Sequence, residues 1–293
     1  LYPYIQLMKF VAQGPDSHWL INNSRPNTAN APDLISALLG WETMRSWNIG
    51  FDLGMLNNRL TVSFDWFNRK TINMVGPAPE LPVTLGANVP KMNNADMQST
   101  GFELDLGWRD RIKDFDYSVH LLLSDDRQKI LKYPNTTGKI NTWYVGKYNG
   151  DIWGFETIGI AKSQEEMDAH LASLPNGGQD ALGVKWGAGD IMYRDLNGDG
   201  KISDGATLND PGDKKVIGNT SPRFRFGLDL NASWKGIDVR LFFQGVAKRD
   251  AWLNDNMFWG ATGGIWQSAC FTSHLDFFRE EGDDFWSANK DAY

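Results

Sequence analysis

The chain has 293 residues and is rich in aromatic side chains, with 13 Trp, 16 Phe and 8 Tyr beside 30 Gly. Its net charge of -7 and the lack of a Lys/Arg-rich stretch argue against nucleic acid as a partner. The single cysteine, Cys270, excludes an internal disulfide framework, and no apolar run of about 18 residues suggests a membrane-spanning helix.

The first regular pattern begins at Trp47, where apolar and polar residues alternate. The alternation runs to Met55, breaks at Asn57-Asn58 and resumes from Leu60 to Trp66. Successive side chains of a β-strand point to opposite faces, so a period of two predicts strands with one apolar and one polar face. Two asparagines between such runs predict a tight turn, and together the runs predict a β-hairpin.

The same pattern occurs twice more along the chain. Alternating runs cover residues 101–108 and 115–124, and the charged stretch Arg109 to Asp114 is the expected turn between them. A third pair covers residues 224–234 and 237–244, with Lys235-Gly236 as the turn. Two weaker strands are expected at residues 4–12 and near Ala251.

Alternation alone fits two architectures. A half-buried sheet of a soluble sandwich has one apolar face, and so does the wall of a transmembrane β-barrel, whose polar face lines the interior. Strands of about 10 residues favour the barrel, because this length crosses a bilayer at a tilt. Tryptophans also stand at the ends of the apolar faces, as in the aromatic girdles of such barrels. They are Trp47, Trp66, Trp108 and Trp234.

The connections between strands also favour the barrel. The hairpin turns are short, whereas the links between hairpins are long: residues 70–99, residues 125–222 and everything after Gly245. Outer-membrane barrels combine short turns on one side with long loops on the other. We therefore predict an all-β fold, an antiparallel transmembrane β-barrel segment with long extracellular loops. A soluble, calcium-containing, carbohydrate-binding β-sandwich is the alternative. In the barrel, charged residues of the polar faces line the lumen: Asp52, Asp65, Glu103, Asp105, Asp116, Asp229 and Arg240.

The long loop region 125–222 contains a helix motif. Ser163-Gln164-Glu165-Glu166 is a capping box, in which the Ser163 hydroxyl accepts from an N–H of the first turn and Glu166 reaches back. Met167, Leu171 and Leu174 follow at helical spacing, so a short helix is expected at about 164–174.

An acidic stretch at 195–203 follows in the same region. It resembles the first half of a calcium loop, with Gly200 at the sixth position. The twelfth position is Ala206, so the usual bidentate glutamate is missing, and Asp204, Asp210 or Asp213 is needed to complete the shell. The candidate ligands are the side chains of Asp195, Asn197 and Asp199, the backbone carbonyl of Lys201 and the hydroxyl of Ser203. A loop of Asx turns without metal is the alternative, so Ca²⁺ is a candidate cofactor and none is required.

Aromatic residues of the expected loops form a candidate substrate-binding set, because aromatic faces stack on sugar rings. Their alternative role is packing against one another or against a partner. The set is Trp143, Tyr144, Trp153, Trp259 and Trp266. The sequence contains no nucleophile elbow, no phosphate-binding glycine loop and no carboxylate pair at a catalytic spacing, so no enzymatic activity is expected.

Five separated motifs, all in the same order, resemble the SusC/RagA family of TonB-linked outer-membrane transporters. The resemblance spans Trp41 to Arg249. The motifs are Trp41-Glu42-Thr43, Val75-Gly76-Pro77-Ala78-Pro79, Asn93-Asn94-Ala95-Asp96 with Thr100-Gly101-Phe102-Glu103, Gly189 to Ile202, and Val216 to Phe224.

The resemblance implies a TonB-dependent barrel in the outer membrane of a Bacteroidetes-type Gram-negative bacterium. Such proteins import glycans, or in some cases peptides, and a SusD-like surface lipoprotein closes over their mouth. The TonB system supplies energy through a plug domain. We expect residues 1–293 to form a partial barrel in contact with outer-membrane lipid, without the plug and the closing strands, so that transport belongs to a longer parent protein.

Overall fold

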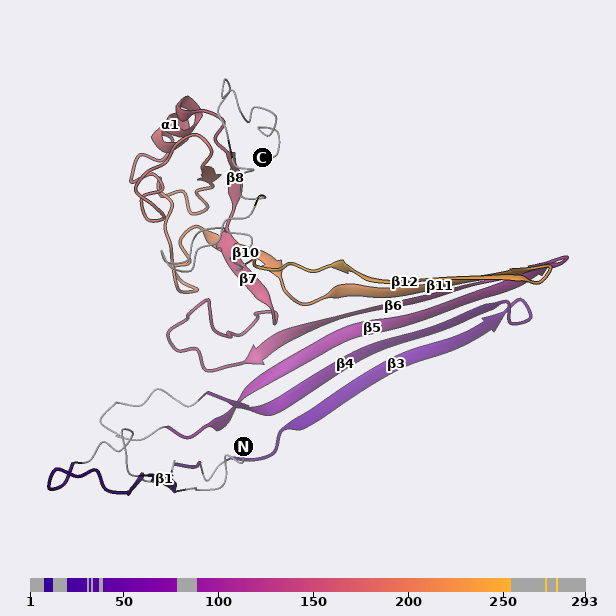
Figure 1. Ribbon diagram of the computed structural model, residues 1–293, viewed down its shortest axis with the longest axis horizontal. Coiled ribbons are helices and arrows are strands. Elements are labelled where there is room, and N and C mark those ends of the chain that lie inside the picture. Colours follow the sequence, from indigo (N-terminus) through magenta and orange to yellow (C-terminus); the bar gives the residue numbers. More distant parts are fainter. Residues whose placement is uncertain are drawn as a thin grey trace. The chain divides into compact units, whose positions relative to one another are not determined.

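The computed structural model (Figure 1) describes residues 8–12, 20–30, 32, 34–36, 39–77, 89–253, 272 and 278. The chain divides into two compact units, and each is described by itself. The first comprises Leu1–Thr136, Trp143–Tyr148 and Phe226–Gln244, and the second Thr137–Thr142, Asn149–Arg225 and Gly245–Tyr293. Among the described residues, no helix has the length and apolar character needed to span a bilayer.

A six-stranded sheet dominates the first unit, in the order β12-β11-β6-β5-β4-β3. The pairs β3–β4, β4–β5 and β5–β6 are antiparallel. The strands are β3 Thr43–Met55, β4 Leu60–Gly76, β5 Met92–Ile112, β6 Phe115–Lys132, β11 Arg223–Trp234 and β12 Ile237–Lys248. Four of them exceed the expected ten residues clearly, with 13, 17, 21 and 18 residues in β3 to β6.

The three hairpin turns all lie at one end of the sheet, at the right in Figure 1, as predicted. Residues 56–59 join β3 to β4 with positive φ at Asn57 and Asn58, a conformation that asparagine tolerates. Lys235 and Gly236 both have positive φ, the geometry of a type I′ turn, whose twist matches that of the flanking strands.

The predicted extent of the second turn is wrong. Residues 109–112 continue β5, and only Lys113 and Asp114 turn the chain, with Lys113 at φ 57°. The charged residues stay in the ladder because they face suitable partners, such as Arg111 opposite Asp116. The Nε of Arg111 lies 3.7 Å from the Asp116 carboxylate.

Strand pairing gives the sheet two chemically distinct faces. One row across β3 to β6 pairs Phe51, Phe64, Leu104 and Leu123, and the next pairs Leu53, Val62, Leu106 and Leu121. Trp66 and Trp108 bound this apolar band at its two ends. Residues that are paired across strands share a face, so the polar residues between these rows project from the other side.

The apolar face is not covered by a second layer in the part of the chain that the structure describes. Phe51 is 51% exposed, Leu53 48% and Leu241 49%. The only fully buried apolar side chains described in this sheet are Ala95 and Ile130. A sandwich would bury this face, whereas a barrel wall leaves it to lipid.

The long link between β6 and β11 begins later than residue 125, because β6 continues to Lys132. Its larger part, from Asn149 on, belongs to the second unit and is folded. It holds β7 Asp151–Phe155, β8 Thr157–Ile160, α1 Gln164–Ala172, β9 Ile191–Tyr193 and β10 Lys214–Asn219. β7 pairs with β10 and β8 with β9, both antiparallel. Sequence alternation missed these strands because they are short and pair over long distances in the chain.

The predicted helix begins at the predicted cap, Ser163, but Glu166 reaches back to the residue before the cap. The Ser163 hydroxyl accepts from the N–H of Glu166 at 3.3 Å, and the Glu166 carboxylate accepts from the N–H of Lys162 at 2.7 Å. Helix α1 packs through Met167, which is fully buried with Ala161 and Met192. Buried Gln179 holds β9 beside the helix, because its side chain bonds to His170, to the Tyr193 N–H and to the Ile191 carbonyl.

The two weaker predictions have different outcomes. Within the expected strand at 4–12, β1 (Lys9–Val11) pairs with β2 (Thr28–Asn30). The strand expected near Ala251 is absent from the described residues there, since β12 ends at Lys248 and 249–253 are irregular.

Candidate functional site

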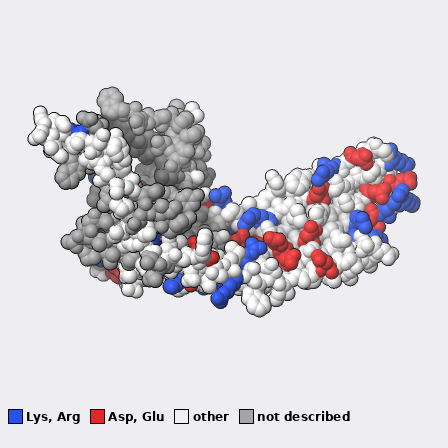
Figure 2. Space-filling view, turned by 90° about the horizontal axis from the view of Figure 1, so that it is seen from below, with Lys and Arg blue, Asp and Glu red and all other residues white. Residues whose placement is uncertain are grey.

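The polar face of the sheet is the first candidate surface. Asp65 on β4 lies directly opposite Glu103 on β5, and the neighbouring row places Asp52 and Asp105 on either side of Ser63. In Figure 2, acidic and basic side chains both lie along the visible face of the sheet, and both are dense at the end where the hairpins turn. Facing carboxylates repel each other, and water reduces this repulsion by solvating them. This face is therefore suited to water and not to an apolar core.

Two side-chain contacts organise the acidic groups on this face. The His120 Nε2 lies 2.6 Å from an Asp105 carboxylate oxygen. The Arg240 Nε lies 3.1 Å from both carboxylate oxygens of Asp229, a fork that joins β11 to β12. Asn231 donates to Asp229 at 3.0 Å and to the Ser118 hydroxyl at 3.3 Å. The sequence suggested the polar face but not these partners, which only strand register brings together.

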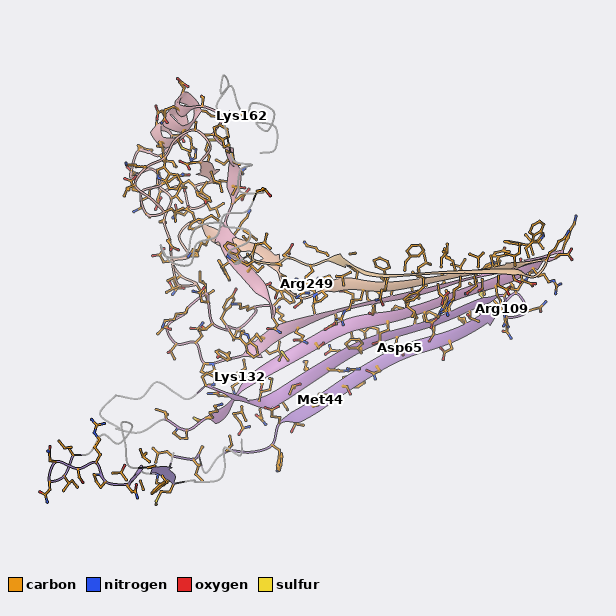
Figure 3. All side chains as sticks on the ribbon, viewed as in Figure 1. Met44, Asp65, Arg109, Lys132, Lys162 and Arg249 are labelled. Carbon is orange, nitrogen blue, oxygen red and sulfur yellow. The ribbon has the colours of Figure 1, made fainter. Side chains whose placement is uncertain are left out.

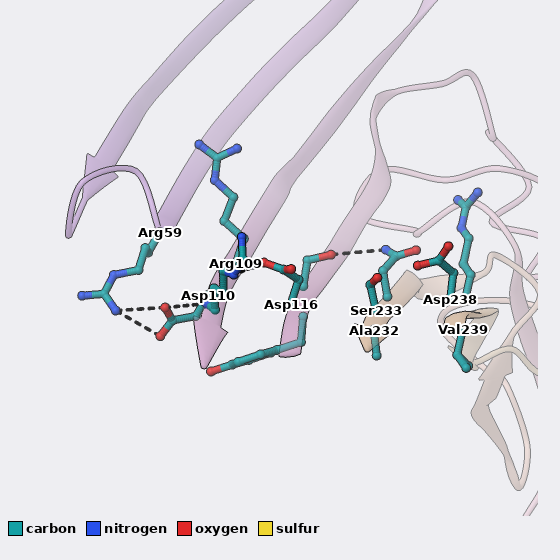
Figure 4. Close-up of a pocket in the computed structure, with 13 residues that line it drawn as sticks. Arg59, Arg109, Asp110, Asp116, Ala232, Ser233, Asp238 and Val239 are labelled. Atoms are coloured by element: carbon teal, nitrogen blue, oxygen red, sulfur yellow. Dashed lines mark hydrogen bonds and ion pairs between the residues drawn. The ribbon is translucent and has the colours of Figure 1, made fainter. Parts of the chain in front are cut away.

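A cavity of about 730 Å³ lies at the end of the sheet where the hairpins turn (Figure 4). Arg59 binds both carboxylate oxygens of Asp110, at 3.1 and 3.0 Å. This pair joins the turn of the first hairpin to β5 of the second. Arg109 and Arg240 also line the cavity, together with Asp116 and Asp238. Charges of both signs therefore meet here, which suits hydrogen bonding to polar groups more than the capture of a single ion.

The acidic loop is the second candidate site, and it is built from Asx turns. The two carboxylate oxygens of Asp195 accept from the N–H groups of Gly198 and Gly200, at 2.6 and 2.8 Å. Partial burial alone would raise the pKa of Asp195. The N–H donors of Gly200, Gly198 and Asp199 outweigh it, so the pKa lies below its ordinary value.

Asp213 joins this loop from outside the predicted stretch. Its side chain is fully buried and accepts from the N–H groups of Leu196 and Ser203, both at 2.7 Å, and from the Ser203 hydroxyl at 3.1 Å. The carboxylates of Asp195, Asp199 and Asp213 lie within 4.8 Å of one another. Asp213 was one of three residues considered for completing the shell, and spacing alone could not choose among them.

The oxygen-only set suits a hard cation such as Ca²⁺ in its chemistry. Of the five predicted ligands, Asp195 and Asp199 face the cluster. Asn197 instead accepts the Asp199 N–H at 2.9 Å, the Lys201 N–H donates to Asp199 at 3.1 Å, and Ser203 is turned toward Asp213. These contacts also form a self-sufficient loop, so calcium remains a proposal.

The described aromatics of the predicted substrate-binding set lie in different units. Trp143 packs against Tyr133 with ring centroids 5.6 Å apart, and the Lys147 ammonium lies 5.4 Å from the Tyr144 ring. Both belong to the first unit, whereas Trp153 lies on β7 of the second. Trp259 and Trp266 lie outside the described residues. The packing alternative is therefore observed for Trp143.

Comparison with known proteins assigns the chain to a family. The profile of a family described as TonB dependent receptor-like, beta-barrel, matches residues 12–256. The chain belongs to this TonB-dependent receptor family. Its relatives include TonB-dependent receptor P26 of Formosa agariphila, 29% identical over 71% of this chain, and P3 of the same organism, 25% identical over 83%. SusC of Bacteroides thetaiotaomicron is 25% identical over 78% of the chain.

Solved structures also share the fold of this chain. One is described as the RagAB peptide transporter, and it covers 95% of this chain with a TM-score of 0.63 and 21% identity. The similarity confirms the SusC/RagA resemblance and makes the six-stranded sheet a segment of a β-barrel wall. The chain spans only 20–24% of the length of the three named relatives and 28% of that solved chain.

Proposed function

We propose that the parent of this chain is a TonB-dependent outer-membrane importer of glycans or other large nutrients. One observation carries the proposal: a chain of this receptor family forms a single-layer sheet whose apolar face is uncovered and whose other face is charged and polar. A barrel wall in a bilayer has an apolar face toward the lipid and a polar face toward the lumen. The chain then supplies part of the wall and a folded extracellular segment, and no catalytic role is proposed.

The inner face has the chemistry of a hydrated path. Asp65, Glu103 and the Asp229–Arg240 pair offer acceptors and donors to hydroxyl or amide groups of a passing oligomer. Aromatic side chains add stacking surfaces for sugar rings. We assign this role to the half-buried Trp143, Tyr144 and Trp153, of which Trp143 also packs on Tyr133, and to Trp259 and Trp266. Loop-side capture and a polar lumen together suit substrates larger than a single sugar or amino acid.

The partners follow from the relatives. The names SusC and RagAB, the latter described as a peptide importer, support a SusD-like surface lipoprotein over the loop side of the parent. The family supports coupling to the TonB system. A Ca²⁺ ion in the acidic loop would stiffen the extracellular unit without taking part in transport.

Deletion of the parent gene tests the transport proposal. The deletion strain should lose growth on one class of oligosaccharide or peptide while keeping growth on the corresponding monomers, and the intact gene should restore it. A tagged parent should co-purify with a surface lipoprotein. Unchanged growth on every oligomer tested, with no lipoprotein recovered, would contradict the proposal.

Calorimetry on the purified parent tests the metal. We expect Ca²⁺ to bind weakly to the wild type and not to Asp199→Ala, because this substitution removes a carboxylate from the three-residue cluster. Asp180→Asn, which alters an exposed carboxylate of the same unit, is the control. Absence of Ca²⁺ heat in the wild type would leave the Asx turns as the whole explanation of the loop.

A further inference from the structure

The apolar face of the sheet becomes basic beyond the row that contains Trp66 and Phe102, on the side away from the hairpin turns. The next row holds Trp47, Asn68, Thr100 and Arg127, and the one after it holds Arg45, Lys70, Gln98 and Lys129. These two rows contain four basic side chains and no carboxylate. Since cross-strand pairs share a face, all four project from the outer face that carries Phe64 and Leu104.

A cavity of about 480 Å³ lies in this basic zone. Trp66 and Phe102 line its apolar side, and Arg127 and Lys129 line its polar side. The Tyr148 ring forms another wall, 3.8 Å from the Arg127 guanidinium carbon and 5.8 Å from the Lys129 ammonium. An amphipathic ligand would meet both kinds of surface in one place.

The chain after β6 holds this wall in position. The N–H of Ile130 donates to the Lys147 carbonyl and the N–H of Gly146 donates to the Ile130 carbonyl, both at 2.9 Å. Asp125 also lines the cavity but is only 8% exposed, whereas Arg127 and Lys129 are exposed. An incoming ligand therefore meets the two cations first.

The two ends of the outer face differ in charge. At the turn end Arg59 is neutralised by Asp110. In the part of the chain that the structure describes, none of the four basic side chains of the loop end forms an ion pair. Figure 3 locates this end by Met44, which precedes Arg45, and by Lys132, three residues beyond Lys129, with Arg109 at the turn end. Unpaired cations beside an apolar band favour an anionic headgroup in the adjoining leaflet.

We propose that this zone binds a phosphorylated glycolipid of the outer leaflet, with its phosphate at Arg127 and Lys129 and an acyl chain along Phe64 and Leu104. The inference rests on the proposed location of the parent in the outer membrane. A guanidinium binds phosphate oxygens through paired hydrogen bonds, and the ammonium adds a point charge. Arg45 and Lys70 extend the same positive field across β3 and β4.

Lipid retention by the purified full-length parent tests this proposal. Native mass spectrometry measures the glycolipid retained per protein in the wild type and in Arg127→Gln/Lys129→Gln. We expect a roughly tenfold or greater loss in the double variant. The matched control, Lys113→Gln/Lys235→Gln, removes the same charge at the turn end and should retain lipid like the wild type. Arg127→Lys/Lys129→Arg, which keeps the charge, should also retain it.

Assembly of each variant is checked by heat-modifiable gel mobility. Equal retention in an assembled double variant would overturn the proposal. So would an assembled wild type that binds inorganic phosphate and retains no glycolipid, because the site would then be one for free phosphate. Growth on nutrients is scored separately. If the parent retains glycolipid but supports no uptake, the lipid site stands and the importer proposal fails. If the parent is missing from outer-membrane fractions, both proposals fail.

Discussion

At the scale of single residues, close backbone packing explains why one strand position must be glycine. Gly101 lies opposite Phe67, and a Cβ placed there would come within 2.4 Å of the Asp125 carbonyl oxygen and 2.6 Å of the Phe67 ring. Gly101 is itself buried, so the aromatic ring covers the gap that its missing side chain leaves. The Thr100-Gly101-Phe102-Glu103 motif therefore has a packing reason as well as a family resemblance.

Gly101→Val should destabilise the barrel wall by about 1–3 kcal/mol, the usual cost of overpacking. The measurement is urea unfolding of the full-length parent, followed by heat-modifiable mobility. Gly227→Ala on β11 is the control, because the nearest atoms to its added Cβ are at 3.8 Å or more. Equal stability of the valine variant and the wild type would mean that Phe67 moves aside freely.

Glu156 illustrates electrostatics at the same scale. Its carboxylate forms an ion pair with Lys215 of β10 and lies 3.3 Å from the Arg194 Nε after β9. The hydrogen bond from Lys215 is the main cause that holds the pKa of Glu156 below its ordinary value. A pKa lowered by folding means that the stabilisation is complete above the unfolded pKa of about 4.3 and is lost as pH falls through the folded pKa.

Acidification should therefore loosen the contacts of Glu156 with β9 and β10. Hydrogen exchange of amides around Arg194 and Lys215, corrected for intrinsic rates, should quicken in the wild type as the pH falls below about 4.3. In Glu156→Gln the change should be smaller, because no ion pair remains to be lost. The effect should shrink in high salt, since both side chains are partly exposed. An identical pH response in the two proteins would show that this pair does not couple the strands.

At the scale of elements, alternation predicted the hairpins because one face of each strand meets lipid and the other meets water. It underestimated strand length because ladder pairing continues after the alternation stops, as between Asn68 and Thr100. It also placed charged residues of β5 in a turn. Partners from another hairpin, such as Arg59 for Asp110, keep them in the ladder, and such partners cannot be identified from one strand alone.

The face assignment predicts opposite outcomes for neighbouring substitutions in β4. Val62 lies in the apolar band between Leu53 and Leu106, whereas Ser63 lies between Asp52 and Asp105. Val62→Arg should cost about 2–4 kcal/mol near the bilayer midplane and reduce the assembled barrel, while Ser63→Arg should assemble and alter only permeation. Gel mobility of outer-membrane fractions and nutrient-dependent growth distinguish the two. Normal assembly of Val62→Arg with failure of Ser63→Arg would mean that the faces are reversed.

At the scale of the whole chain, the acidic loop and the basic zone show what the sequence could not supply. Asp195 and Asp199 are recognisable as candidate ligands from their spacing. Asp213 lies beside them only because the fold of the second unit brings it close. Arg45, Lys70, Arg127 and Lys129 are scattered over three strands, and register alone aligns them in two rows. Motifs that are local in sequence are predictable, whereas sites assembled by strand pairing require the structure.

The sheet also predicts how these 293 residues behave without the rest of a barrel. β3 and β12 stand at the two edges of the described sheet, with 13 and 12 residues whose backbones have a neighbour on one side only. Unpaired edges recruit other strands, and the uncovered apolar face adds hydrophobic association. The chain produced alone should therefore form concentration-dependent oligomers in detergent-free buffer and be dispersed by detergent, as sedimentation velocity would measure. A monodisperse monomer with a cooperative unfolding transition would instead require a second layer over Phe51 and Leu53, the arrangement of a soluble sandwich.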